Sequence, residues 1–201
     1  LVPPERVIEG LVLSYLLDRV ERKYGSNVII AVNSDRLAYV LSNYLAISKS
    51  SITLYDIGTD NDTMNCSVKE LFNKYKAISI ELASKIGTKF IALPFTLNDF
   101  NELAIYSLLV ENTIDSEIIS ASFKEDNIIF INPFFNVQRI DVHVLAYLKG
   151  IYETLSTFIE FNSSCKALDD VLRIIKEFVN DISIRNVELT YSIVKSVKRL
   201  T

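Results

Sequence analysis

Four polar residues, Asn33, Ser34, Asp35 and Arg36, separate an apolar run at 27–32 from an amphipathic segment. The run "NVIIAV" has the composition of a strand buried on both faces, and the residues after the turn keep helical spacing. Where a strand turns directly into a helix, the free N–H groups of the helix can hold a phosphate. Sites that wrap a phosphate in backbone use glycine, which adopts a positive φ at little cost, and this turn has no glycine. The four residues therefore form a working anion site, an altered one, or only a tight connection.

Carboxylates supply the second set of candidates. Asp56 ends the next apolar run, and Asp60 and Asp62 follow it in a polar loop. In open α/β folds, ligands bind at the carboxyl ends of the strands, which is where these residues are predicted to lie. Asp99 and Glu102 stand at the start of a later helix, and their spacing is that of a capping box with an acid at the N-cap. Taken alone, that pair has a structural explanation.

Histidine and metal chemistry have little support in this sequence. His143 is its only histidine, and it falls inside a predicted helix, "VQRIDVHVLAYLKG", which favours a packing or surface role over a catalytic triad. Cys66 and Cys165 stand about a hundred residues apart, too few and too distant for a disulfide framework or a four-cysteine zinc site. No cluster of histidine, cysteine or carboxylate has the spacing of metal ligands. We expect no metal.

The elements that position these residues alternate along the chain. Apolar spacing predicts strands at 27–32, 51–58, 89–94, 117–123 and 127–133, and helices at 4–23, 37–45, 68–86, 99–110, 137–150, 167–181 and 184–199. Strands that alternate with helices imply a parallel sheet, and therefore an α/β fold. We predict an α/β domain over residues 1–151 that includes the N-terminal helix, with a C-terminal helical pair, 152–201, packed on it.

Charge and hydropathy narrow the classes of protein further. The net charge of −4 argues against a free-standing nucleic-acid binder, although Lys195, Lys198 and Arg199 could form a local basic patch. Such cations near a helix C-terminus are most often explained by the helix dipole and solvent. Charged residues interrupt every apolar run before the roughly 20 residues that a bilayer requires, so we expect no membrane span. The start "LVPPERVIEG" lacks the pattern of a secretory signal, and a cytoplasmic location is expected.

Four segments stand in an order that is more informative than any one of them. They are "IIAV" and "LAYVLSNYLA" around "NSDR", then "LYDIG", "PFTLNDFNELAIYSLL" and "IIFINPFFNVQRIDVHVLAYLKGI". In this order they resemble the PP-loop ATP pyrophosphatase superfamily, also called adenine nucleotide alpha-hydrolase-like, and within it the tRNA 2-thiolation proteins. The first segment corresponds to the family's SGGxDS loop, and the third to its GHNLDDxAET helix, with Leu97, Asp99 and Glu102 in register. The resemblance covers about residues 28–151 and implies a Rossmann-like, three-layer domain.

The resemblance also implies where a nucleotide would bind. The positions that match the family's nucleotide site are Asn33, Ser34, Asp35, Arg36, Asp56, Asp99 and Glu102. In active members the SGGxDS loop wraps the ATP phosphates while AMP is transferred to a tRNA base. Here the loop has four residues instead of six and has lost both glycines. Only Asp35 matches the family's acid, and it is also a good helix N-cap.

The sequence also departs from the family pattern at the GHN triplet beside the nucleotide and at the cysteine pair that carries sulfur in the thiolation proteins. The GHN triplet is replaced by Pro94, Phe95 and Thr96, and one cysteine of a C-x-x-C pair remains, at Cys66. Three losses together suggest that catalysis has been given up. The resemblance thus implies a non-catalytic protein, similar to the second subunit of the cytosolic tRNA thiouridylase, that supports wobble-uridine 2-thiolation by an active PP-loop paralogue. It would need no cofactor of its own, would form a hetero- or homo-oligomer, and would reach tRNA through the complex, with help from Lys195, Lys198 and Arg199.

Two alternatives remain open. The chain could be an enzyme or sensor that binds a nucleotide by a changed route, with ATP held at the four-residue turn. In that case Arg36 would replace the lost amides as a bidentate phosphate ligand, and Asp56 would lie near the ribose. The chain could also be an α/β domain with no relation to the PP-loop proteins.

Overall fold

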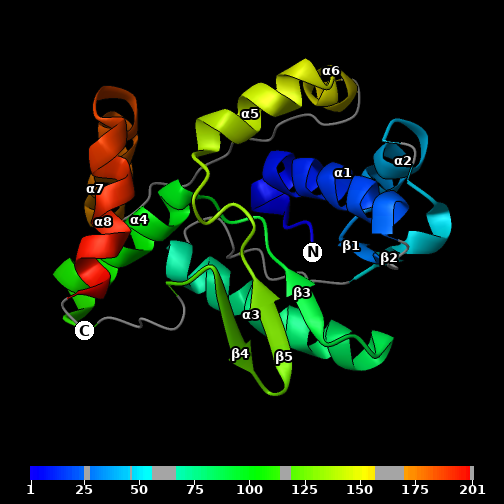
Figure 1. Cartoon of the computed structure of the whole chain (residues 1–201), viewed down its shortest axis with the longest axis horizontal. Helices are drawn as coiled ribbons and strands as arrows, with labels where there is room; N and C mark the ends of the chain where they lie inside the picture. The colour runs from blue at the N-terminus through cyan, green and yellow to red at the C-terminus, as the bar shows by residue number, and fades with distance from the viewer. Residues whose placement is uncertain (25–27, 46, 56–66, 114–118, 157–169, 200–201) are drawn as a thin grey trace. The chain divides into compact units, whose positions relative to one another are not determined.

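The computed structural model describes residues 1–24, 28–45, 47–55, 67–113, 119–156 and 170–199 (Figure 1). The chain divides into two compact units. The first unit comprises Leu1–Thr59 and Ile140–Asn162, and the second comprises Asp60–Arg139 and Ser163–Thr201. Each unit therefore combines two segments that are separated in the sequence, and each contains its own small sheet.

The first unit is built on two parallel strands. Its elements are the 3-10 helix η1 (Pro4–Arg6), α1 (Val7–Tyr24), β1 (Ile30–Val32), α2 (Asp35–Asn43), the 3-10 helix η2 (Lys49–Ser51), β2 (Ile52–Leu54), α5 (Arg139–Leu148) and α6 (Ile151–Ser156). The first residue of α5, Arg139, belongs to the second unit. In the sheet, Ile30 lies opposite Ile52 and Val32 opposite Leu54. Both strands contact α2, and α1 contacts α6.

The N-terminal segment lies along β1 in the first unit. The N–H of Val2 donates to the carbonyl of Ala31 at 2.9 Å, and Val2 forms a parallel bridge with Val32. Gly10 of α1 makes room for this segment, because a Cβ there would lie 2.7 Å from Cγ1 of Val2. Val2, Leu11 and Val32 are all buried, so this close approach forms part of the apolar core of the unit.

The second unit holds a three-stranded mixed sheet with strand order β3-β5-β4. Its elements are α3 (Val68–Ile86), β3 (Phe90–Ala92), α4 (Leu97–Tyr106), the π-helical segment η4 (Ser107–Glu111), β4 (Ser122–Glu125), β5 (Ile128–Ile131), α7 (Asp170–Arg185) and α8 (Val187–Lys198). The strands β3 and β5 are parallel, and β4 and β5 form an antiparallel hairpin. Asp126 and Asn127 turn the hairpin with φ angles of 47° and 63°, the sign that a two-residue type I′ turn requires.

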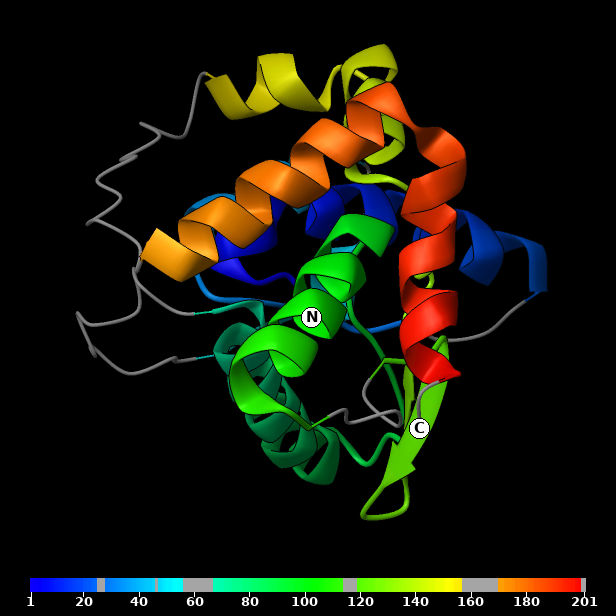
Figure 2. The same ribbon diagram turned by 90° about the vertical axis from the view of Figure 1, so that its left-hand side faces the viewer.

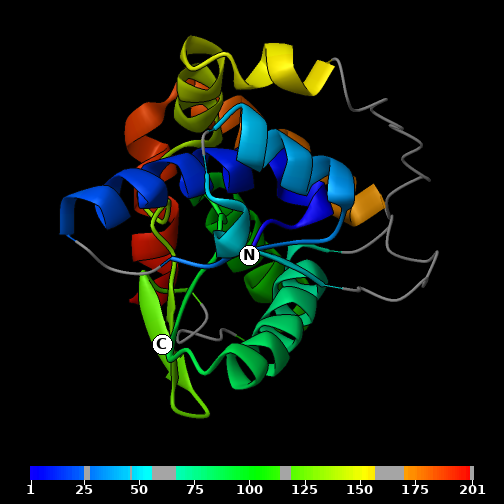
Figure 3. The same ribbon diagram turned by 90° about the vertical axis from the view of Figure 1, so that its right-hand side faces the viewer.

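In the second unit, α3 packs against the sheet, and α7 and α8 pack against α4. The helix α3 begins with a capping box between Ser67 and Glu70 and ends at Gly87, whose φ of 76° is the usual left-handed stop. Figure 3 shows α3 running beside the strands of this sheet. The ring of Phe72 on α3 contacts that of Phe123 on β4. The helices α7 and α8 pack on α4 and on each other (Figure 2).

The α/β class and the parallel strand pairing predicted from the sequence are confirmed, and so are the two C-terminal helices, as α7 and α8. The division at residue 151 stays a prediction. Within the described ranges, none of the helices combines the length and the apolar character that a membrane crossing would need.

Candidate functional site

The turn between β1 and α2 is organised by Ser34. This residue is the N-cap of α2: its backbone is extended, with φ −147° and ψ 147°, and its hydroxyl accepts from the N–H of Leu37 at 3.2 Å. The prediction that Asp35 caps the helix is wrong. Asp35 is the first helical residue, so its side chain is one position too late to accept from the first turn as an N-cap does. The serine directly before it has the extended backbone that a cap needs.

The backbone of this turn does not form a phosphate nest. A nest needs residues that alternate between right- and left-handed conformations. Positive φ angles in the described ranges occur at Gly87, Asn112, Asp126, Asn127 and Gly150. The turn at 33–36 therefore contains none, and one of the first free N–H groups of α2 is already bound to Ser34.

The other side chains of the turn differ in exposure. Asp35 and Arg36 are exposed, whereas the Oδ1 atom of Asn33 is buried and has no hydrogen-bond partner within the described part of the chain. The carboxylate of Asp35 supplies a negative charge in the first turn of α2, where the helix dipole would otherwise favour a bound anion. Asp56, predicted to lie near a ribose, falls outside the described residues.

Tyr55, the residue before Asp56, is held in place by two hydrogen bonds. The N–H of Tyr55 donates to the carbonyl of Val32, and its hydroxyl donates to the carbonyl of Val2 at 3.1 Å. Burial, followed by the negative charge of Glu5, raises the pKa of Tyr55 well above its ordinary value. The phenol is therefore a neutral donor that ties the end of β2 to the N-terminal segment.

In the second unit, Asp99 is placed at the start of α4. Its Oδ2 atom accepts from the N–H of Thr96 at 2.8 Å and from the Thr96 hydroxyl at 2.7 Å. Thr96 is thus the N-cap residue and Asp99 occupies the third helical position. The expectation that Asp99 itself is the N-cap, with Glu102 as its capping-box partner, is wrong by three residues. Both patterns satisfy the same spacing rule, and the sequence alone did not distinguish them.

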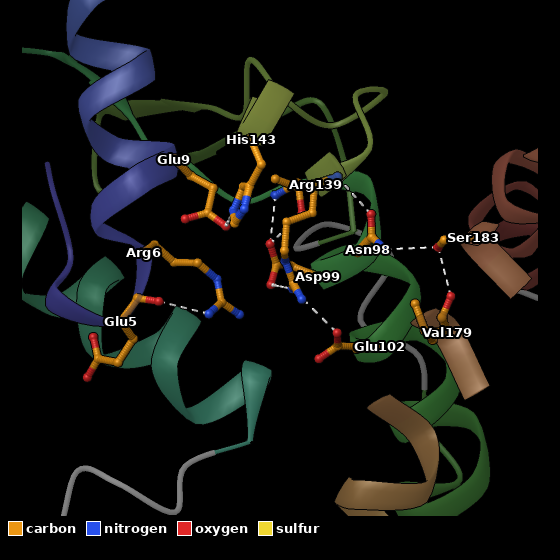
Figure 4. A network of polar contacts seen from close by, with 11 residues as sticks. Glu5, Arg6, Glu9, Asn98, Asp99, Glu102, Arg139, His143, Val179 and Ser183 are labelled. Carbon is orange, nitrogen blue, oxygen red and sulfur yellow. Dashed lines mark hydrogen bonds and ion pairs between the residues drawn. The ribbon is translucent and has the colours of Figure 1, made fainter. Parts of the chain in front are cut away.

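The structure pairs Asp99 and Glu102 with one guanidinium group, that of Arg139 (Figure 4). Arg139 Nη2 lies 2.7 Å from Asp99 Oδ1 and 3.4 Å from Glu102 Oε1. The side chains of Asp99 and Glu102 are 1% and 7% exposed, and that of Arg139 is 18% exposed. Because the two acids are buried, the positive charge of Arg139 offsets part of the cost of burying theirs.

Asn98 extends the network to the C-terminal helices. Its Oδ1 atom accepts from the N–H of Arg139, and its Nδ2 atom donates to Ser183 Oγ, which donates in turn to the carbonyl of Val179 (Figure 4). Asn101 makes a similar link, because its Nδ2 atom donates to the carbonyl of Thr190. The polar face of α4 is therefore bonded to α7 and α8.

Sequence reasoning missed Arg139, Thr96 and Asn98 as members of this network. The sequence did contain one signal, which is that four polar residues of α4 stand among apolar ones: Asn98, Asp99, Asn101 and Glu102. The structure shows that all four are buried. Four such groups in one buried helix require internal partners. Arg139, forty positions later, gave no such signal.

The predicted tRNA-binding residues lie on or just after α8. Lys195 lies on the last turn of the helix, Lys198 ends it, and Arg199 follows as the C-cap residue. Lys195 and Arg199 are exposed. The side chain of Lys198 falls outside the part of the chain that the structure describes. The exposed pair is compatible with a phosphate contact, and that role stays a prediction.

The described residues include no group of three or more histidine, cysteine, aspartate or glutamate side chains that could hold a metal ion.

Comparison with known proteins identifies a related fold. No family model matches the sequence, and no curated protein matches it either. Among solved structures, the chain is similar to the U34-tRNA thiolase NcsA from Methanococcus maripaludis, with a TM-score of 0.68 and 19% sequence identity. The match covers 96% of this chain and 69% of that one. At this identity the likeness establishes the fold.

That thiolase was solved with its [4Fe-4S] cluster. Such clusters are commonly held by four cysteine thiolates, and the present sequence contains two cysteines, Cys66 and Cys165, both outside the described residues. The residues present do not fit a cluster of that type, and we derive no chemistry from one.

Proposed function

We propose that this chain is a non-catalytic subunit of the PP-loop type that supports 2-thiolation of wobble uridine in tRNA by an active PP-loop paralogue. The likeness in fold to a U34-tRNA thiolase supports the link to thiolation. The β1–α2 turn carries the non-catalytic part of the proposal. Its four residues lack glycine and lack any left-handed conformation.

The charges at the β1–α2 turn also favour a non-catalytic role. A pyrophosphate bound at the start of α2 would meet the Asp35 carboxylate within the first turn of the helix. The turn offers Arg36 as its one cation, which leaves most of the charge of a triphosphate uncompensated. Catalytic phosphate sites instead concentrate backbone amides, cations and metal ions on the transferring group.

The acids of α4 support the same conclusion. Asp99 uses one oxygen to cap α4 and the other to bind Arg139, which also pairs with Glu102. A carboxylate that acts on a nucleotide or a metal ion must have an oxygen available for it. Here the carboxylates hold the fold of the second unit together, so the family's chemistry would have to be performed by the partner.

The first experiment is co-purification of the tagged full chain from its source cell. We expect a second PP-loop protein with an intact SGGxDS loop, together with tRNA, and we expect the two proteins to thiolate tRNA when combined in vitro. A matched variant, Lys195→Ala with Arg199→Ala, should retain the partner protein and lose part of the tRNA. Recovery of the chain without any PP-loop protein would count against the proposal.

A second experiment tests catalysis directly. The purified chain is incubated with radiolabelled ATP and tRNA, with and without the partner. We expect AMP transfer to tRNA only when the partner is present. Transfer by this chain alone would show that the turn binds ATP productively, and the non-catalytic proposal would then fail.

The alternative function, a nucleotide sensor, rests on the exposure of Arg36 at the first turn of α2. A ligand that binds only the folded state raises the melting temperature as its concentration rises. The test is thermal unfolding with ATP and AMP at millimolar concentration, with Arg36→Ala as the control. A shift that disappears in the variant would favour the sensor, whereas the non-catalytic proposal expects none.

A further inference from the structure

A second polar cluster, formed by Glu9, His143 and Tyr152, joins three helices of the first unit. His143 on α5 places Nε2 3.3 Å from Glu9 Oε1 on α1 and Nδ1 2.6 Å from the hydroxyl oxygen of Tyr152 on α6. Glu9 is buried, at 5% exposure, whereas the side chain of His143 is 32% exposed. Figure 4 shows the Glu9 and His143 side chains turned toward each other.

The protonation of this cluster follows from its electrostatics. Partial burial and the negative charge of Glu9 raise the pKa of Tyr152 above its ordinary value, so the phenol keeps its proton at neutral pH. Because a carboxylate oxygen only accepts, the ring proton belongs on Nε2, which donates to Glu9, and Nδ1 then accepts from the Tyr152 hydroxyl. The opposite tautomer would turn the lone pair of Nε2 toward a carboxylate oxygen.

This arrangement is a hydroxyl bonded to an imidazole whose other nitrogen is bonded to a buried carboxylate. The same order of groups activates the hydroxyl nucleophile in catalytic triads on unrelated folds. We infer that Tyr152 is a nucleophilic tyrosine, with His143 as its general base and Glu9 as the positioning residue, and that it accepts a phosphoryl group from an activated phosphate ester.

The step balances within the cluster. The phenol oxygen forms a bond to phosphorus while the bond from phosphorus to the leaving group breaks. The phenol proton passes to Nδ1, and the resulting imidazolium is stabilised by Glu9 on its other side. The proton then passes to the leaving group or to solvent. Aryl carboxylic esters hydrolyse readily and aryl phosphates are stable in water, which is why we assign the phosphoryl class for a lasting modification.

The same nucleophile can be measured with an aryl sulfonyl fluoride, a tetrahedral electrophile that needs no binding site. The phenol oxygen bonds to sulfur, the sulfur–fluorine bond breaks, and His143 takes the proton. The full chain is labelled at pH 7 and the modified tyrosines are mapped by mass spectrometry. Tyr39, Tyr44 and Tyr147 serve as internal references, because they are 50%, 51% and 72% exposed.

We expect Tyr152 to be labelled at least about tenfold faster than Tyr147. This is less than the roughly 100-fold that a general base contributes at the low end, because Tyr152 is also less exposed than Tyr147. A purely structural cluster would instead give slower labelling, because Tyr152 is less exposed than the reference residues. A Tyr152 rate equal to or below that of Tyr147 overturns the inference. Tyr152→Phe identifies the labelled peptide.

Two variants test the roles of the other residues. His143→Gln keeps a hydrogen-bonding side chain without a base, and we expect it to reduce Tyr152 labelling to the Tyr147 rate or below while the Tyr147 rate is unchanged. Glu9→Gln should cause a smaller loss, of several fold, because the base remains. Labelling of Tyr152 that is indifferent to His143→Gln in a folded variant overturns the inference.

The pH profile of the unmodified chain provides a measurement that needs no variant to fold. Labelling of an ordinary phenol far below its pKa rises about tenfold per pH unit, because the phenolate reacts. Base-assisted labelling does not require the phenolate, because the base takes the phenol proton during the reaction. We expect the Tyr152 profile to rise less steeply than the Tyr147 profile, and parallel profiles would contradict the role of His143.

Discussion

Two polar regions, the β1–α2 turn and the start of α4, differ sharply in how they are built. At the β1–α2 turn, Asp35 and Arg36 are exposed, and one hydrogen bond from Leu37 to Ser34 organises the backbone. At the start of α4, Asp99 and Glu102 are buried and bound to Arg139. The turn is a short connection with exposed side chains, whereas the α4 network is part of the interior of its unit.

This difference shows how burial decides what a polar group requires. The exposed side chains of the turn remain in contact with water, so replacing one of them leaves no buried charge behind. A buried acidic pair requires a partner, because unpaired carboxylates in the interior are very costly. Arg139 is that partner in the second unit. Changes at the network should therefore cost stability, and changes at the turn should cost little.

The largest effect is expected at Arg139. Arg139→Met removes the guanidinium and leaves Asp99 and Glu102 buried together, which costs about 3 to 5 kcal/mol in the free energy of unfolding. Urea unfolding followed by circular dichroism measures the loss. The matched control is Arg173→Met on α7, since Arg173 also bridges two carboxylates, Asp170 and Glu177, but at the surface.

The control should leave the free energy of unfolding unchanged within experimental error, because exposed ion pairs are screened by solvent. If Arg139→Met proved as mild as the control, the acids would be supported by other groups, and they would then be candidates for a ligand role. A further variant that replaces Asp99 and Glu102 with Asn and Gln together with Arg139→Met should recover part of the lost stability.

Much of the fold was accessible from the sequence, because it depends on local spacing. Apolar periodicity located the helices, and Gly87 and Gly150 marked two helix ends through their left-handed conformation. The strands are shorter than predicted, since the flanking apolar residues extend beyond the paired ones: the run at 89–94 contributes Phe90–Ala92 to the sheet.

The sites were harder to predict because they depend on partners distant in sequence. The network of Asp99 with Arg139 joins positions forty residues apart, and the link from Asn98 to Ser183 spans eighty-five. The cap positions were misplaced for a local reason, since Ser34 precedes Asp35 and Thr96 precedes Asp99, and either member of each pair can cap a helix. Backbone conformation decides between them, and residue type alone does not.

A second, smaller effect should appear beside the turn, at Tyr55. Tyr55→Phe removes the hydroxyl that donates to the Val2 carbonyl and should cost roughly 1 to 2 kcal/mol at neutral pH. Because the pKa of Tyr55 is raised in the folded state, its contribution is complete below the unfolded value near 10 and is lost as the pH rises toward the folded value.

The difference in unfolding free energy between the wild type and Tyr55→Phe should therefore shrink between pH 9.5 and 11, the range around the ordinary tyrosine pKa of about 10. Tyr147→Phe, at an exposed tyrosine, is the control and should show no such trend. A constant difference across this range would mean that Tyr55 ionises equally easily in the folded and unfolded chain. The hydrogen bond from Tyr55 to Val2 would then not stabilise the end of β2 beside the turn.

At the turn itself, Ser34→Ala should cost about 1 kcal/mol, the usual value for loss of an N-cap side chain. The Leu37 N–H loses its acceptor, and α2 begins with one more unsatisfied donor. Ser34→Asp keeps an acceptor and should retain most of the stability. A loss as large as that of Arg139→Met would mean that the turn is as deeply built into the fold as the α4 network, and the contrast between the two regions would disappear.

The smallest effect is expected at Asp35, the residue that the sequence favoured as the cap. Asp35→Asn removes a charge from the first turn of α2 and should cost about 0.3 to 0.5 kcal/mol, the weak end of a charge–dipole interaction at an exposed position. This cost should fall as salt is added, because the charge is exposed, whereas the cost of Ser34→Ala should not. If Asp35→Asn instead cost more than Ser34→Ala and was insensitive to salt, Asp35 would be the cap. Ser34 would then be available to a ligand, and the turn would regain one of the donors on which an altered phosphate site depends.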